Sequence, residues 1–150
     1  MKVIFECTPG SLKQTYSTIS SVIEGVNRGT KWATELACQL IYEESQFQVP
    51  RDTGTLAESG FYAVERRTEL AKSSYRYRGI IGYGGNGDPT NPKTLIPASV
   101  YARTVHEDLS AKHPNGGKAK FLEDPLRDFA ERGELYAIFS EYIRLGIRRL

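Results

Sequence analysis

The chain has 150 residues, of which 39% are hydrophobic and 25% charged, and its formal net charge is only +2. This composition predicts one folded domain with its own core, and it argues against a disordered chain, a membrane protein and a chain drawn to nucleic acid by bulk charge. The two cysteines are too few for a disulfide framework or a paired-cysteine zinc site. We therefore expect free thiols and, since no signal-peptide pattern is seen, a protein that is made and kept in the cytosol or leaves it by another route.

The first elements predicted are a short extended segment and a long helix. Val3, Phe5 and Cys7 occupy alternate positions, which predicts a strand or an extended arm over residues 2–8. From Ser11 to Ser45, apolar residues recur mostly at steps of three and four, as on one face of a helix. An unbroken helix of this length is roughly 50 Å long, whereas a globule of this size is about 40 Å across. The helix therefore either breaks near residues 25–30 or projects, and a projecting apolar face must be buried against another copy or another protein.

A turn and two strands are predicted next. Pro50 ends the helix, and residues 50–56 have the composition of a turn. The ranges Phe61–Arg67 and Ser74–Tyr83 are predicted as strands that pair antiparallel. On the second strand, alternation places tyrosines inward and Arg76 and Arg78 outward.

The last third of the chain alternates loops and helices. Residues 84–96 and 109–119 are predicted as extended loops, and a short helix begins at Pro97 between them. Asp124 and Pro125 have the pattern of the start of a final helix, with Gly133 as a possible break. The expected fold is a single α+β domain over residues 1–150, with a long N-terminal helix, a small antiparallel sheet, a short central helix and a C-terminal helix.

His106, Glu107, Asp108 and His113 form the one cluster with metal-ligand chemistry. His106 and Glu107 are adjacent and so point to different sides of a helix. His106 and His113 are seven positions apart across a loop, which is not the spacing of a zinc motif. A polar surface histidine pair is therefore favoured. A metal-dependent hydrolase or nuclease using the His106 and His113 region stays open as the alternative, and a nucleic-acid-binding module based on the interleaved tyrosines and arginines is a third hypothesis. No nucleophile motif is found, so we expect no enzymatic activity, cofactor or metal.

Three motifs in order carry a resemblance to a known family. They are VPRDTGTLAES at residues 49–59, VYARTVHEDL at residues 100–109 and GGKAKFLEDPL at residues 116–126. Together with the long helix and the two strands, they resemble the tail-component family of tailed bacteriophages, also called minor capsid, neck or tail-completion proteins. The positions that match the family motifs are Pro50, Asp52, Thr53, Gly54, Leu56, Tyr101, Ala102, His106, Glu107, Phe121, Leu122, Pro125 and Leu126.

The resemblance implies a structural protein of the virion, assembled in the cytoplasm of the bacterial host. It implies a homo-oligomer, expected as a hexameric ring at the head-to-tail junction, with no membrane association. Its neighbours would be portal, adaptor or stopper proteins on the head side and tail-tube or tail-terminator proteins on the tail side. DNA would pass through the ring without sequence-specific binding, and Arg76 and Arg78 are candidates to face that channel.

Overall fold

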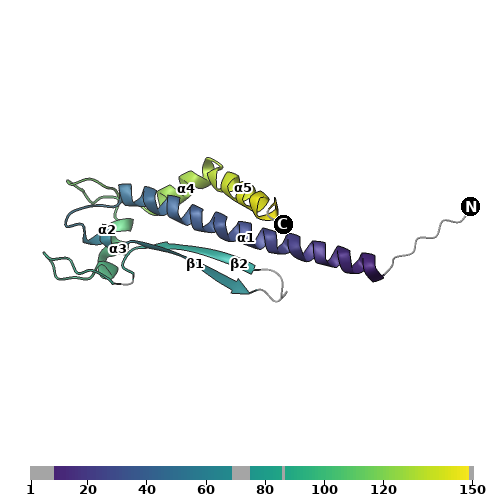
Figure 1. Ribbon diagram of the computed structural model, residues 1–150. Coiled ribbons are helices and arrows are strands. Elements are labelled where there is room, and N and C mark those ends of the chain that lie inside the picture. Colours follow the sequence, from purple (N-terminus) through teal and green to yellow (C-terminus); the bar gives the residue numbers. More distant parts are fainter. Residues whose placement is uncertain (1–8, 69–74, 86, 149–150) are drawn as a thin grey trace, which may run out of the picture.

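The computed structural model describes residues 9–68, 75–85 and 87–148. The predicted α+β fold is confirmed, with helices and a two-stranded antiparallel sheet (Figure 1). The elements in chain order are α1 (Pro9–Gln48), α2 (Thr55–Glu58), β1 (Phe61–Thr68), β2 (Tyr75–Gly82), α3 (Ala98–Glu107), α4 (Glu123–Glu131) and α5 (Glu134–Arg148).

Helix α1 is unbroken over its 40 residues, which makes it about 60 Å long. Helices α4 and α5 lie along one side of it and the hairpin of β1 and β2 lies along another (Figure 1). The first turns of α1 extend past both, and every described side chain from Lys13 to Ile19 is exposed. Of the two alternatives left by the sequence, projection is therefore the correct one.

Gly25 and Gly29 do not break α1 because α5 packs directly against them. A Cβ atom on residue 25 would lie 2.8 Å from the carbonyl oxygen of Gly146. Arg28 donates a hydrogen bond from Nη2 to the same oxygen, at 3.0 Å. The glycines thus allow the two backbones to approach closely, in a role that helix propensity alone does not indicate.

The hairpin has the predicted antiparallel pairing, with a register that runs from Phe61 opposite Gly82 to Thr68 opposite Tyr75. One face rests on α1, where the rings of Tyr42 and Tyr62 are 5.4 Å apart. Tyr77 is half-buried while Arg76 and Arg78 are exposed, which confirms that the arginines point outward. The connection between the strands, residues 69–74, lies outside the described residues.

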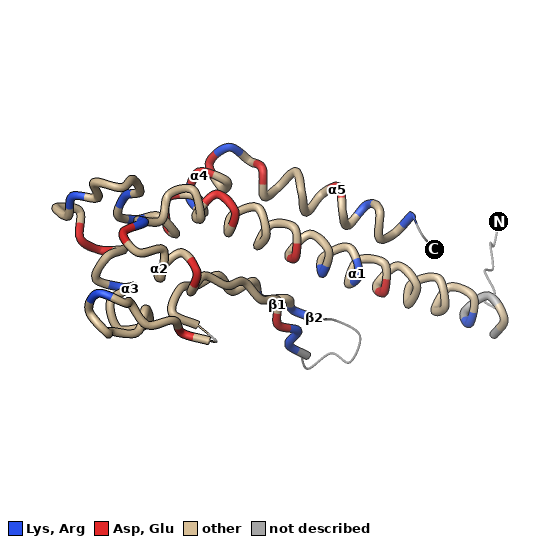
Figure 2. The backbone as a smooth tube through the Cα atoms, turned by 60° about the vertical axis from the view of Figure 1, so that its left-hand side comes forward, with Lys and Arg blue, Asp and Glu red and all other residues tan. Residues whose placement is uncertain are grey.

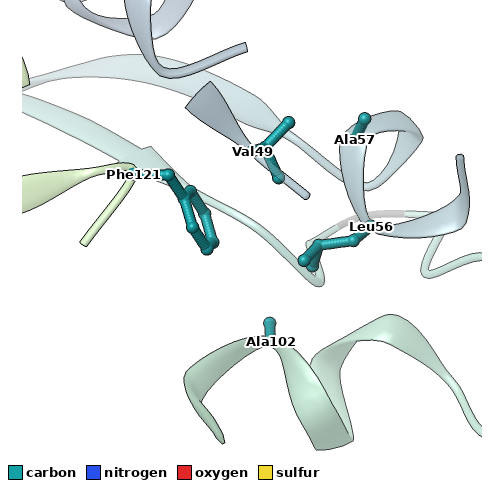
Figure 3. Packing of buried hydrophobic residues seen from close by; sticks show 5 residues of the cluster. All are labelled: Val49, Leu56, Ala57, Ala102 and Phe121. Carbon is teal, nitrogen blue, oxygen red and sulfur yellow. The ribbon is translucent and has the colours of Figure 1, made fainter. Parts of the chain in front are cut away.

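An apolar cluster closes the end of the molecule where α1 stops. It joins the residue that follows α1, the short helix α2, helix α3 and the segment before α4 (Figure 3). Its buried members are Val49, Leu56, Ala57, Ala102 and Phe121. Helix α2 was not predicted, because four residues are too few to show a helical period.

The starts of α1 and α4 differ by one or two residues from the predicted ones. The predicted strand or arm over residues 2–8 lies outside the described residues, and α1 begins at Pro9, two residues before Ser11. Helix α4 begins at Glu123, so Asp124 lies inside its first turn rather than at the N-cap. The predicted break at Gly133 is confirmed, since this residue has φ 74° and separates α4 from α5.

Candidate assembly surfaces

The residues of the first two motifs meet at one end of the molecule, which we call the loop end (residues 49–60 and 83–122). A cavity of about 280 Å³ opens there between the turn after α1, the 84–96 loop, α3 and the 109–119 loop. Its lining consists of Pro50, Asp52, Thr53, Gly54, Leu56, Asn91, Thr94, Ile96, Tyr101, Val105 and His113. The structure thus brings together six of the predicted site residues, from segments about 50 positions apart.

The turn after α1 has a geometry that its sequence explains. Gly54 has φ 84°, a left-handed conformation that side chains with a Cβ rarely adopt. Thr53 and Thr55 share a hydrogen bond of 2.8 Å between their Oγ1 atoms. Lys93 reaches back from the 84–96 loop to Asp52, with 2.7 Å between Nζ and Oδ1. This ion pair is exposed and contributes little stability, but it joins the loop to the turn.

The 84–96 loop is ordered by specific hydrogen bonds. Asp88 accepts hydrogen bonds from the backbone N–H (2.9 Å) and the hydroxyl of Ser99, in the first turn of α3. The Tyr101 hydroxyl bonds to Asn91 and Thr55, and burial raises its pKa. Leu95 has φ 57° and is 77% exposed, so an apolar side chain is held outward on a strained backbone.

The two histidines lie in different surroundings and do not form the predicted surface pair. His106 is 17% exposed, and its ring packs edge-on against Phe121 at 5.0 Å between centroids. His113 instead lines the loop-end cavity. Although His106 and Glu107 were expected to point apart, the Glu107 carboxylate turns back to within 2.9 Å of Nδ1. Within the described ranges, no group of three or more His, Cys, Asp or Glu side chains is placed to hold a metal ion.

Glu107 belongs to an ion-pair network that joins the end of α3 to the start of α4. Lys120 lies 2.5 Å from Glu107 and 2.9 Å from Glu123. The hydrogen bond from Lys120, and then that from His106, lowers the pKa of the Glu107 carboxyl. The same network raises the pKa of Lys120. These ion pairs hold the end of α3 and the start of α4 in a fixed relative orientation.

Two residues of the third motif are structural. Phe121 is fully buried in the apolar cluster at the end of α1, and Pro125 is buried in the first turn of α4. Leu122 is half-buried and packs against the same cluster, and it also lines two hollows of the surface. Phe121 and Pro125 therefore support the shape of the loop end, whereas Leu122 is partly accessible.

Arg76 and Arg78, the candidate channel-facing residues, are exposed on the sheet face that points away from α1. In the strand register they lie opposite Arg67 and Glu65, so this face carries both signs of charge. Figure 2 shows acidic and basic residues next to each other on this part of the hairpin.

Exposed apolar side chains lie at both ends of the elongated molecule, in addition to others on α4 and α5. At the projecting end of α1, Tyr16 is 75% and Ile19 is 54% exposed. At the loop end, Leu95, Val100 and Leu109 are exposed. The helical period predicted the apolar face of α1. The period could not predict how much of this face stays uncovered, because that depends on where α5 and the hairpin end.

Comparison with known proteins gives no match, since no protein family model, curated protein or solved structure is similar to this chain at the significance we required. The family resemblance carried by the three motifs therefore stays a prediction. Among the described helices, none is both long and apolar enough to cross a membrane.

Proposed function

We propose that this chain is a structural subunit of a tailed-bacteriophage virion that forms a ring at the head-to-tail junction. The ring, expected to be hexameric, would connect the head connector to the tail and let DNA pass. Its function is assembly: the ends of each subunit contact neighbouring subunits or adjacent rings. No described feature favours the metal-dependent alternative.

The observation that carries the proposal is the projection of α1. Its first turns extend past α5 and the hairpin (Figure 1), and they present Tyr16, Ile19 and Val22 to solvent. A solitary apolar side chain on a surface is ordinary, but a row of them on a projecting helix marks an interaction surface. Burying this row against a neighbouring subunit removes apolar area from water, which is the main driving force of association.

The loop end supports the same proposal. Leu95 is held outward at a positive φ by a loop that is itself ordered by Asp52, Asp88 and Asn91. A strained and exposed apolar residue on an ordered loop suits a contact with a partner, because strain of this kind is maintained where it serves a function. A subunit with one such surface at each end can contact neighbours on two sides, as a closed ring requires.

The first experiment is to measure solution mass by light scattering over a concentration series. We expect a mass several times that of the chain, and six times that of the chain for a hexamer. The double variant Tyr16→Ser/Ile19→Ser should weaken association at least tenfold, which corresponds to about 1.4 kcal/mol.

The matched control is Lys13→Ser/Gln14→Ser, two substitutions to serine at exposed polar positions of the same turns. This control should associate like the unchanged chain. A monomeric mass at all concentrations for the unchanged chain, or equal effects of the two double variants, would contradict the proposal.

A further inference from the structure

An apolar groove, separate from the loop-end cavity, lies over the middle of α1. Its volume is about 490 Å³, its floor is α1, and its walls are β2 on one side and α4 and α5 on the other. Ala37, Cys38 and Ile41 come from the floor, and Leu126 and Phe139 come from the helical wall. Leu126 is 50% exposed, so the groove is open to solvent.

The strand wall of this groove is an unpaired sheet edge. Within the described residues, β2 has β1 as its one strand partner, and no backbone hydrogen bond joins Gly79–Ile81 to another segment. The group that reaches this edge from α1 is the Cys38 sulfur, which accepts a hydrogen bond from the Ile80 backbone N–H. A thiol is a weak partner, so the edge keeps its capacity to pair with a further strand.

We infer that residues 2–8 of a second copy of this chain bind in the groove as a third strand beside β2. Residues 2–8 have the alternation of a half-buried strand, with Val3, Phe5 and Cys7 on one side. Pairing with the β2 edge supplies their backbone hydrogen bonds, and the apolar side chains enter the groove over α1. This mode of recognition combines main-chain pairing with pockets for alternate side chains.

The geometry of α1 requires the second copy. Thr34, the groove residue nearest to the start of α1, lies 25 positions after Pro9, which is about 37 Å along the helix axis. Phe5 lies four residues before Pro9, and four extended residues span at most about 14 Å. Residues 2–8 of a chain therefore cannot reach the groove of the same chain. A neighbouring subunit that packs on the projecting helix brings its own groove close to these residues.

This inference rests on the proposed self-association, and pairing of residues 2–8 with the β2 edge would be one of its contacts. A helix was the other candidate occupant of the groove. The backbone N–H and C=O groups of a helix are already bonded within the helix, so a helix cannot pair with the open strand edge.

The test uses the fact that the chain has only two cysteines, Cys7 and Cys38. One partner carries Cys38→Ser and so keeps only Cys7. The other carries Cys7→Ser, Cys38→Ser and Leu126→Cys. The two are mixed and oxidised with diamide, and the disulfide-linked dimer is quantified on a non-reducing gel and identified by mass spectrometry. Because each partner has a single thiol, the Cys7-to-126 bond can form only between copies.

The matched control replaces Leu126→Cys by Tyr136→Cys, at a position on α5 that is more exposed but does not line the groove. We expect at least tenfold more cross-linked heterodimer with the variant at position 126. Equal or greater cross-linking with the variant at position 136, or none at position 126, overturns the inference.

A second measurement separates this inference from the proposed function. Deletion of residues 2–8 should weaken association, measured by light scattering, at least tenfold. If the unchanged chain forms an oligomer and the deletion leaves its mass unchanged, the inference fails and the proposed function stands. If the unchanged chain is a monomer and no cross-link forms, both fail.

Discussion

At the scale of single residues, three glycines decide how the two longest helices meet. A Cβ atom on Gly29 would lie 2.6 Å from the Cα atom of Ile143, and one on Gly146 would lie 2.9 Å from the backbone nitrogen of Gly29. Backbone atoms of a helix cannot move aside as a flexible side chain can. The close packing of α1 and α5 therefore depends on the absence of side chains at these positions.

We expect Gly29→Ala to lower the free energy of unfolding by about 1–3 kcal/mol, the usual cost of overpacking a closely packed site. Urea denaturation followed by circular dichroism measures this change. The control is Gly10→Ala on the same helix, where no atom lies within 4 Å of the added Cβ. The control should leave stability unchanged or slightly raised, because alanine has the higher helix propensity. Equal stability of the two variants would show that α5 does not pack on Gly29.

Tyr83 gives the stability of the fold a dependence on high pH. Its hydroxyl lies 2.7 Å from the Oγ atom of Ser45, a fully buried residue that itself donates to the Tyr42 carbonyl. Burial raises the pKa of Tyr83 to about 12, above the value of about 10 for an unfolded tyrosine. The neutral hydroxyl therefore stabilises the folded state below pH 10, and this contribution is lost as the pH rises toward 12.

Tyr83→Phe should flatten the fall in the free energy of unfolding between about pH 10 and 12. At neutral pH it should cost about 1 kcal/mol, because the Ser45 hydrogen bond is lost. The ring contact with Phe121, at 5.1 Å between centroids, is kept. The control Tyr136→Phe changes an exposed tyrosine. The same alkaline slope in the unchanged chain and in Tyr83→Phe would refute this assignment.

At the scale of elements, the start of α4 is stabilised by charge rather than by the predicted N-cap. Asp124 lies 2.6 Å from both Lys118 and Arg127. These contacts, that with Lys118 first, lower the pKa of the Asp124 carboxyl. A carboxylate in the first turn also interacts favourably with the helix dipole. The 109–119 loop is thereby fastened to the helix that follows it.

A lowered pKa in the folded state means that the Asp124 carboxylate stabilises the fold above about pH 4, the pKa of an unfolded aspartate, and that this contribution is lost as the pH falls below it. Asp124→Asn should therefore cost about 1 kcal/mol at neutral pH and flatten the acid side of the stability profile. The control is Asp128→Asn, on the same helix, whose carboxylate lies 3.9 Å from Arg132. An unchanged acid limb in Asp124→Asn would contradict the ion-pair assignment.

At the scale of the whole molecule, α1 is one helix with two different environments. Residues 33–41, except Gln39, are buried or half-buried where α5 and the hairpin pack on α1, while residues 13–19 are exposed. Local stability follows the number of tertiary contacts, so the two halves should open with different free energies.

Hydrogen exchange measures this difference. In the dissociated subunit, amides of residues 13–22 should exchange at the earliest time points, and those of residues 33–41 should be protected close to the global limit. In the assembled protein, residues 13–22 should gain protection while residues 33–41 stay as they were. Uniform protection along α1 in the dissociated subunit would show that the projecting turns are stable without a partner.

The elements themselves could be predicted from the sequence because their signals are local. The apolar period from residue 12 to residue 41, the alternation in the two strands, Pro50 and Gly133 each depend on neighbours within a few positions. Helix α2 could not be predicted, because four residues show no helical period. The exact start of α4 could not be predicted either, because Asp124 is bound by Lys118 from the preceding loop as well as by Arg127 from the helix itself.

The candidate surfaces were only partly predictable. The sequence by itself determined most of the helical, extended and turn segments, and it showed that α1, if unbroken, would be longer than a globule of this size is wide. The tertiary structure alone decided that α1 is unbroken at Gly25 and Gly29, that His106 packs on Phe121 while His113 lines the loop-end cavity, and that Asp52 pairs with Lys93. The physical reason is range: periodicity and turn chemistry act over a few residues, whereas helix packing, ion pairs and cavities join atoms that the chain brings together from far apart.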